Sequence, residues 1–320
     1  NHEGSIDRAY ELADSAISAG AQILKYQLYS GESLVSRVED PNRVAHFDKF
    51  ALSVEDYLEL ARYIRSKGCD FNASIWQPDL LPLFDQYMSF YKVGSGDLTA
   101  LSVIEKITAY KKPIVLSSGL ATLAEVKATV EFIRSCDKIY DDPSMLAVLQ
   151  CTSMYPIPDD QANLSVMKTF ADELHNISVG YSDHTVGTDA AKMAIAMGAR
   201  VLEVHFTDSR EGKVFRDHAV SFEPHEFSEL RRWSDSYSVL SGSGMKSPTE
   251  IELMSGHVES FRRAVYLNRD IEIGETVSHE DLVVLRPNKG IDARCEGELV
   301  GLRATRAIRA FEKLDFAYFK

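Results

Sequence analysis

The sequence predicts an α/β protein built on a (β/α)8 TIM barrel, followed by a small β-rich domain. Seven strand-like apolar runs precede residue 207, and a helical pattern separates each from the next. Repeated βα units of this kind are typical of a parallel sheet. Polar residues stand at the carboxyl end of nearly every strand, where barrel enzymes build their sites. No G-x-G-x-x-G follows a strand, which argues against a dinucleotide-binding sheet. The unit count reaches eight if a strand precedes Asn1, so we expect the sequence to begin partway through a motif.

The first quarter of the chain alternates between helix and strand patterns, with one interruption. Apolar residues recur at helical spacing over residues 5–19, and a strand follows over residues 21–29. Residues 30–52 are polar and irregular, so we expect a long loop there. Ser53 has Asp56 three residues later, a pattern that predicts a capped helix running to about Lys67.

The same alternation continues to residue 240. Further strands are expected at F-N-A-S-I, F-Y-K-V-G-S, P-I-V-L-S-S, M-L-A-V-L-Q-C-T, I-S-V-G-Y-S and V-L-E-V-H-F. Helices are expected near residues 79–87, 101–109, 122–135, 164–174, 188–197 and 224–240. The composition of residues 241–260 is that of a linker with some helix. Residues 261–320 show short apolar runs with turns, which predicts a β-rich domain near the lower size limit for independent folding. We therefore expect a barrel over residues 1–240, a linker over 241–260 and a second domain over 261–320.

Composition narrows the function classes. Hydrophobic residues make up 45% and charged residues 26% of the chain, which is a globular composition. The formal net charge of −13 argues against nucleic acid or an anionic membrane as a partner. No apolar run is long enough to span a bilayer, and no signal-like segment opens the chain. The four cysteines match no zinc or disulfide spacing, so a reducing cytoplasm fits best.

Two histidines occupy the ends of neighbouring predicted strands. His184 lies in V-G-Y-S-D-H-T beside Asp183, and His205 lies in R-V-L-E-V-H-F two residues after Glu203. A single such histidine is more often a satisfied polar residue than a ligand. Two together favour a metal site, in which water or substrate oxygens complete the coordination. Mn²⁺ suits such a site best, with Mg²⁺, Co²⁺ or Fe²⁺ as alternatives.

Two lysines and two small-residue turns indicate an anion site. Lys25 and Lys92 lie within apolar strands, where an unpaired ammonium group is costly to bury. The alternative is that each emerges at a strand end into solvent. Ser95 and Ser117 stand in Gly/Ser turns between a strand and a helix, where backbone amides can bind phosphate. Such turns are common in βα loops, and the neighbouring Lys92 strengthens the phosphate interpretation.

Two further positions leave alternatives open. Tyr155 precedes Pro156 in a rigid turn, where it could face the barrel mouth or serve a structural role. Asp217 and His218 form a polar pair that could belong to the site or to a surface loop. The remaining histidines have no partner pattern and are read as surface or packing residues.

Seven motifs resemble the sialic acid synthase (N-acetylneuraminate synthase) family. They are N-H-E-G-S at the start, K-Y-Q at 25–27, Y-K-V-G-S-G-D at 91–97, L-S-S-G at 116–119, C-T-S-M-Y-P-I-P at 151–158, G-Y-S-D-H-T at 180–185 and L-E-V-H-F-T-D at 202–208. The C-terminal D-I-E-I-G-E and L-R-P-N-K-G-I resemble that family's antifreeze-protein-like (SAF) domain. The likeness spans essentially the whole chain.

The resemblance implies a metal-dependent condensation of phosphoenolpyruvate with N-acetylmannosamine or a related N-acetylated hexosamine. It implies Mn²⁺ on His184 and His205, and it places phosphoenolpyruvate against Lys25, Ser74, Lys92, Ser95, Ser117, Ser153, Tyr155 and Ser182. It places the sugar against Gln27, Tyr155 and Asp217. It also implies a domain-swapped homodimer, in which Arg286 of one subunit reaches the sugar on the other. The catalytic residues would be Asp97, as general base for a water, together with His184, His205 and Glu203.

Several positions depart from the family pattern. Asp97 stands where the family often has Glu, Ser153 replaces an asparagine, and A-S-I-W at 73–76 replaces Ser-Thr-Pro-Phe. Residues 209–217 lack the common Gly-Pro-Asp. The acceptor therefore stays open, with legionaminic and pseudaminic acid synthases as alternatives that share these motifs. Hypotheses of other classes are a Schiff-base aldolase using Lys25 or Lys92 and a non-catalytic sugar-binding protein.

Overall fold

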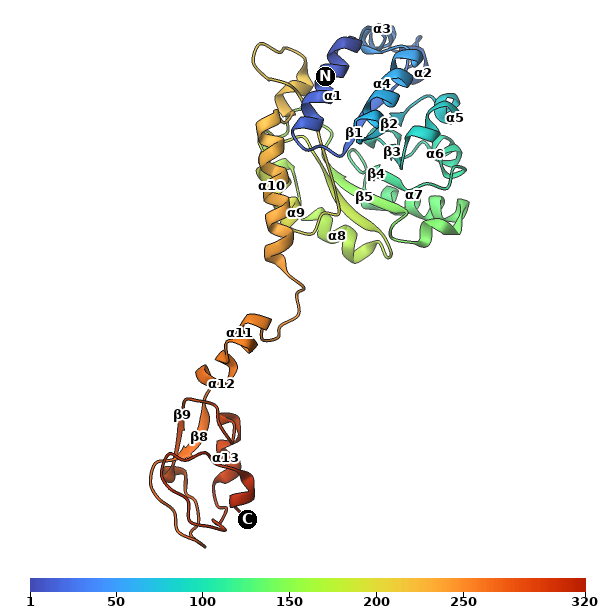
Figure 1. Cartoon of the computed structure of the whole chain (residues 1–320). Helices are drawn as coiled ribbons and strands as arrows, with labels where there is room; N and C mark the ends of the chain where they lie inside the picture. Colours follow the sequence, from blue (N-terminus) through green and yellow to red (C-terminus); the bar gives the residue numbers. More distant parts are fainter. The chain divides into compact units, whose positions relative to one another are not determined.

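The computed structural model describes residues 1–320. The chain divides into two compact units, Asn1–Gly242 and Ser243–Lys320. In Figure 1 the first unit runs from blue to gold and the second is orange to red.

The first unit contains seven parallel strands that follow one another in chain order. β1 (Ile23–Leu28) pairs with β2 (Asp70–Ile75). A second sheet has the order β3-β4-β5-β6-β7, with the bounds Tyr91–Val93, Ile114–Ser117, Leu146–Cys151, Ser178–Asp183 and Val201–Val204. The Asn72 side-chain amide donates to the Phe90 carbonyl oxygen at 2.7 Å, which links the two sheets. All carboxyl ends therefore lie along one edge.

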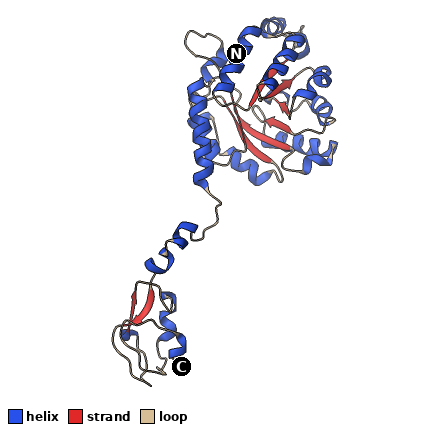
Figure 2. Ribbon diagram, in the orientation of Figure 1, coloured by secondary structure: helices blue, strands red, loops and turns tan.

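Helices separate the strands and surround them, as Figure 2 shows in blue. The structure has α1 (Ile6–Ser18), α4 (Val54–Ser66), α5 (Leu81–Phe84), α6 (Leu101–Thr108), α7 (Leu123–Cys136), α8 (Val166–Glu173), α9 (Asp189–Ala196) and α10 (Pro224–Ser241). The predicted alternation is confirmed, with ends that differ by one or two residues. The one exception is residues 79–87, where α5 is flanked by the 3₁₀ turns Pro78–Leu80 and Asp85–Tyr87. The predicted cap of α4 is also confirmed, because Ser53 and Asp56 bond each other's backbone N–H reciprocally.

The prediction of an irregular loop over residues 30–52 is wrong. The segment contains α2 (Gly31–Leu34) and α3 (Pro41–Phe50). Helix α3 begins at a capping Asp40 followed by proline, but none of its residues is buried. Without a buried face it shows no apolar periodicity, which is the signal that sequence analysis relies on.

The sheets curve so that strands which do not pair still meet through side chains. All six residues of β5 are buried, as expected for a parallel strand covered on both faces. Lys25 of β1 comes within 3.4 Å of Glu203 of β7, measured between Nζ and Oε1. The first and last strands of the unit therefore face each other across a common interior.

The second unit has its own core but few regular strands. It contains α11 (Glu250–Met254), α12 (His257–Phe261), β8 (Ala264–Leu267), β9 (Leu282–Leu285) and α13 (Glu296–Leu299). β8 and β9 are antiparallel, and the remaining β pairings are isolated bridges such as Ile271 with Ile308. Apolar side chains including Val265, Leu299 and Leu314 are fully buried. In neither unit is any helix long and apolar enough to cross a membrane.

Candidate active site

Glu203 lies between two lysines at the carboxyl ends of the strands. Its Oε1 atom is 3.4 Å from Lys25 Nζ, and its Oε2 atom is 3.5 Å from Lys92 Nζ. The Oε1 atom is buried and makes no hydrogen bond, so the contact with Lys25 is an ion pair only. Three strands that are distant in sequence thus bring two positive charges and one negative charge together.

Two serine hydroxyls complete this cluster. Ser182 Oγ donates to Glu203 Oε2 at 2.7 Å. Lys92 Nζ donates to Ser117 Oγ at 2.7 Å and to the Val93 carbonyl oxygen at 2.9 Å. Lys92 is only 5% exposed, so the alternative of a solvent-exposed lysine is wrong at this position.

The pKa shifts at this cluster follow from burial and charge. Burial alone would raise the pKa of Glu203, but the Lys92 and Lys25 ammonium groups lower it well below its usual range. Burial lowers the pKa of Lys92, and the Glu203 carboxylate opposes that shift. Glu203 is therefore an ionised counter-ion at neutral pH and holds the two lysines in place.

A second group of hydroxyls surrounds Gly119. Its backbone N–H donates to Ser95 Oγ at 3.1 Å. A Cβ atom at this position would lie 2.3 Å from Ser153 Oγ and 2.7 Å from Ser95 Oγ, so a larger residue would displace these hydroxyls. Residues from the ends of β3, β4 and β5 thereby present hydroxyls within one small region.

The two histidine rings lie edge to face beside Tyr155. The ring centroids of His184 and His205 are 5.2 Å apart. The ring of Tyr155 lies 4.1 Å from that of His184 and 5.5 Å from that of His205. The Arg216 guanidinium lies 4.2 Å above the Tyr155 ring, an arrangement that favours a cation–π contact.

Hydrogen bonds and burial suit both histidines to metal binding. His184 Nδ1 is 2.7 Å from the Thr152 carbonyl oxygen, to which it donates, so Nε2 keeps a free lone pair in the neutral ring. Burial disfavours protonation of His184, but the neighbouring Cys151 raises its pKa. Burial lowers the pKa of His205 to about 4, which keeps that ring neutral near pH 7. Asp217 Oδ2 lies 3.9 Å from His205 Nδ1. No group of three or more His, Cys, Asp or Glu side chains is arranged so that it could hold a metal ion.

Other predicted site residues have less direct placements. Gln27 and Ser74 are partners in the β1–β2 register, near the same strand ends. Asp97 follows β3, and burial raises its pKa while the Lys92 charge opposes that change. Asp183 serves a structural role, because its Oδ1 accepts from Tyr181 and from the backbone and side chain of Thr185. Arg286 lies in the second unit, with its guanidinium 5.6 Å from the Phe261 ring.

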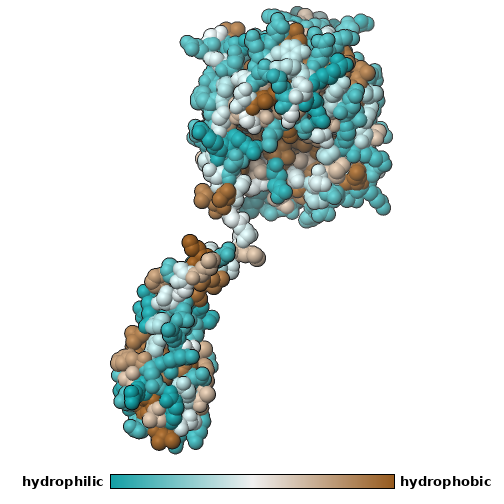
Figure 3. Space-filling view, viewed as in Figure 1, coloured by the Kyte–Doolittle hydropathy of each residue, from teal (hydrophilic) through white to brown (hydrophobic).

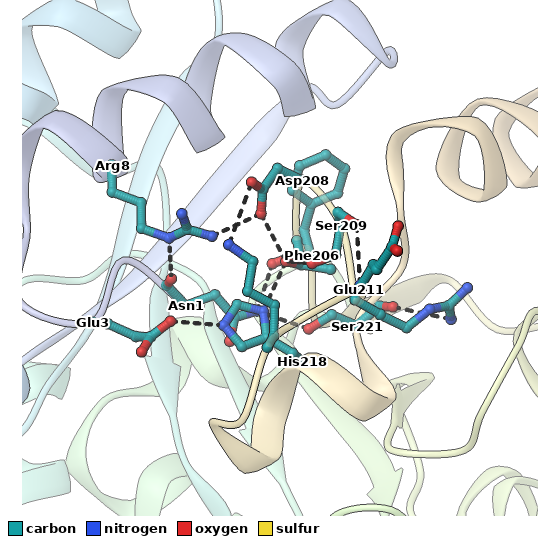
Figure 4. Close-up of polar contacts among 12 residues, drawn as sticks. Asn1, Glu3, Arg8, Phe206, Asp208, Ser209, Glu211, His218 and Ser221 are labelled. Atoms are coloured by element: carbon teal, nitrogen blue, oxygen red, sulfur yellow. Dashed lines mark hydrogen bonds and ion pairs between the residues drawn. The ribbon is translucent and has the colours of Figure 1, made fainter.

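Sequence reasoning missed a polar network next to the site. His218 is 1% exposed, so the surface-loop alternative for it is wrong. Its Nε2 lies 3.0 Å from Glu3 Oε1 and its Nδ1 lies 2.8 Å from Thr207 Oγ1. Figure 4 shows Glu3, Asn1 and Arg8 converging on the segment that follows β7. The motif N-H-E-G-S marked the opening segment, but nothing in the sequence linked it to His218.

Paired ammonium groups, a row of hydroxyls and two imidazoles at the carboxyl ends of parallel strands define an enzyme site for a small anionic substrate. The NeuB family model matches residues 12–246, and the SAF domain model matches residues 262–312. The chain belongs to the NeuB family of nonulosonic acid synthases and carries a SAF domain at its C-terminal end.

Curated relatives carry the names of several such synthases. The chain is 31% identical to an N,N'-diacetyllegionaminic acid synthase from Legionella pneumophila, over 97% of this chain and 89% of that protein. It is 30% identical to the N-acetylneuraminate-9-phosphate synthase of Mus musculus, over 89% of this chain and 80% of that protein. These near-equal identities do not distinguish among acceptor sugars.

A solved structure supports the same assignment. An N-acetylneuraminic acid synthetase from Leptospira borgpetersenii, crystallised with citrate, superposes with a TM-score of 0.72 at 25% identity. The match covers 80% of this chain and 87% of that chain. The α/β fold with a parallel sheet is therefore shared with an enzyme of the family.

Proposed function

We propose that the enzyme condenses phosphoenolpyruvate with N-acetylmannosamine or a related N-acetylated hexosamine, releasing phosphate and a nonulosonic acid such as N-acetylneuraminic acid. The observation that carries the proposal is the Lys25–Glu203–Lys92 cluster beside the paired rings of His184 and His205. The cluster suits an anionic substrate, and the rings lie close enough to share an acceptor-binding region.

Phosphoenolpyruvate brings a carboxylate and a phosphate, which need concentrated positive charge in an acidic protein. Lys25 and Lys92 supply the charge. The hydroxyls of Ser95, Ser117, Ser153 and Ser182 would donate to the substrate oxygens, together with those of Ser74 and Tyr155. Glu203 holds both lysines at this place before the anion enters.

A divalent metal, Mn²⁺ first and Mg²⁺ or Co²⁺ as alternatives, fits His184 and His205. The His205 ring is neutral near pH 7, and the His184 ring is oriented by the Thr152 carbonyl. When bound, the ion would act as a Lewis acid toward the open-chain aldehyde of the acceptor. Gln27, Tyr155 and Asp217 would orient that sugar.

The bonds and protons balance without a further co-reactant. The C3 atom of phosphoenolpyruvate forms a bond to the aldehyde carbon, whose oxygen takes a proton. Water adds to C2, and the bond from C2 to the phosphate oxygen breaks. Asp97 is proposed to take the proton of that water, since burial raises its pKa towards the range useful for a general base.

We also propose a closed eight-stranded barrel and a domain-swapped homodimer. The meeting of β1 and β7 side chains supports closure of the barrel.

Large apolar side chains stay exposed at the end of α10 and in α11, including Val239, Leu240, Ile251 and Met254. Figure 3 shows apolar surface on the segment that begins the second unit. A partner subunit would cover such a surface and bring its Arg286 to the sugar.

The test is phosphate release from phosphoenolpyruvate with Mn²⁺ and a panel of N-acetylated hexosamines. We expect turnover with one of them and a product of matching mass. A chelator should abolish turnover, and adding Mn²⁺ back should restore it. The panel should include 2,4-diacetamido sugars, because a relative is an N,N'-diacetyllegionaminic acid synthase. Borohydride with pyruvate should trap no adduct, whereas a Schiff-base enzyme would be labelled on a lysine. Absence of phosphate release with every acceptor would refute the proposal.

A further inference from the structure

We propose that Glu3, His218 and Thr207 act as positioning residues, which fix Asp217 and His205 for the acceptor sugar. This inference rests on the proposed function of the same site. It concerns residues that contact neither the lysine cluster nor the paired rings directly.

The three residues form one line of hydrogen bonds through a buried imidazole. Glu3 Oε1 lies 3.0 Å from His218 Nε2, and Thr207 Oγ1 lies 2.8 Å from His218 Nδ1. Thr207 is fully buried and His218 is 1% exposed. The line therefore ties the opening segment to the end of β7 and to the 3₁₀ turn Arg216–Val220.

The partners determine the tautomer of His218. An ionised carboxylate only accepts hydrogen bonds, so Nε2 carries the proton and donates to Glu3. Burial lowers the pKa of His218, which favours the neutral ring, so Nδ1 is an acceptor. The Thr207 hydroxyl then gives its one proton to Nδ1, its shortest contact, rather than to Asp208 Oδ1 or the Ser209 carbonyl oxygen, each 3.1 Å away. The hydrogen bond from His218 in turn lowers the pKa of Glu3. The line thus has one consistent direction, from Thr207 through His218 to Glu3.

Further hydrogen bonds connect the same segments to Asp217 and His205. Asn1 Nδ2 donates to Ser221 Oγ at 2.7 Å, and Ser221 Oγ donates to the Asp217 carbonyl oxygen at 2.6 Å. The Phe222 N–H donates to the His205 carbonyl oxygen at 2.8 Å. Figure 4 shows Asn1, Glu3, Ser221 and His218 grouped around the same turn. The backbone carbonyl groups of Asp217 and His205 are therefore held by hydrogen bonds from residues next to His218.

The opening segment adopts an unusual backbone to reach this position. Glu3 has φ = +51° and Gly4 has φ = +78°. A Cβ atom on Gly4 would lie 2.6 Å from the Lys49 carbonyl oxygen, so the segment packs tightly against the end of α3. A left-handed conformation at a non-glycine residue persists when its surroundings compensate for it, and the Glu3–His218 bond is one of the contacts that hold this segment.

The test compares Glu3→Ala with the conservative Glu3→Gln in the full-length enzyme. Glu3→Ala should raise KM for the acceptor on the order of tenfold, as expected for loss of one charge-assisted hydrogen bond. KM for phosphoenolpyruvate should stay unchanged, because the lysine cluster is separate. Glu3→Gln keeps an acceptor oxygen and should restore most of the acceptor affinity.

A matched control separates positioning from general destabilisation. Tyr91→Phe removes a part-buried hydrogen bond of 2.7 Å to Asp85 in the same unit, from the face of β3 opposite to that of Lys92. It should lower thermal stability without changing either KM. An equal rise of both KM values in Glu3→Ala, or no rescue by Glu3→Gln, would overturn the inference.

A measurement that does not depend on turnover, the NMR signals of the histidine rings, tests the inference separately from the proposed function. Imidazole nitrogen shifts of His218 should show the neutral Nε2–H form in the wild type, and Glu3→Ala should shift the signals of both His218 and His205. Tyr91→Phe should leave them unchanged. If the His205 signals do not respond to Glu3→Ala, the inference fails, whatever substrates the enzyme turns over. If they respond but no acceptor is turned over, only the proposed function fails.

Discussion

At the scale of single residues, Glu203 decides how the anion site is organised. It is the one carboxylate that pairs with both Lys25 and Lys92, and the Lys92 side chain is almost completely buried. Removing one member of a buried pair leaves the other charge uncompensated, which costs more than the pair contributes. A substrate anion can replace that carboxylate as the partner of the lysines.

Glu203→Gln should therefore lower the free energy of unfolding by about 3 kcal/mol in anion-free buffer. Added inorganic phosphate should narrow the difference from the wild type, because it supplies the missing negative charge. Urea denaturation with and without phosphate measures both effects. Glu229→Gln is the control, since its pair with Lys192 is exposed and such pairs contribute 0 to about 1 kcal/mol. A difference that phosphate does not change would contradict this account.

The sequence revealed those site residues that are anomalous for their position. A lysine or histidine inside an apolar strand is conspicuous, so Lys25, Lys92, His184 and His205 could be found directly. Glu3 and His218 could not, because the two residues are 215 positions apart and each is unremarkable alone. Only the fold brings such partners together, and no local pattern encodes their pairing.

At the scale of elements, local signals predicted every strand of the first unit but missed two helices. The strands are buried and apolar, and their flanking helices have apolar faces. Helix α3 lacks such a face and is held by a few aromatic contacts instead. The ring of Phe47 lies 5.1 Å from that of Tyr29, and the ring of Phe50 lies 4.9 Å from that of Phe215. Tertiary contacts thus place an element that its own sequence specifies weakly.

Phe50→Ala should loosen α3 with little effect on global stability. An aromatic pair contributes about 1 kcal/mol beyond its buried area, so opening of α3 should increase roughly fivefold. Hydrogen exchange resolved to residues 41–50 measures this, together with a urea midpoint close to that of the wild type. Leu83→Ala, at a 45% exposed position of α5, should leave exchange in α3 unchanged. Unaltered exchange in Phe50→Ala would show that other contacts hold the helix.

At the scale of the whole molecule, the proposed swapped dimer makes a prediction that a self-contained subunit does not. If Arg286 serves the barrel of the partner subunit, Arg286→Ala and His205→Ala damage different sites. Each homodimer should have little activity.

In a mixed dimer, the barrel of the Arg286→Ala chain is intact and receives its arginine from the His205→Ala chain. Unfolding and refolding the two variants together should therefore restore roughly a quarter of wild-type turnover, since half the dimers are mixed and each has one complete site. Separately refolded variants combined without subunit exchange are the control and should stay inactive. If co-refolding restores nothing while mixed dimers are present, Arg286 acts within its own subunit or not at all.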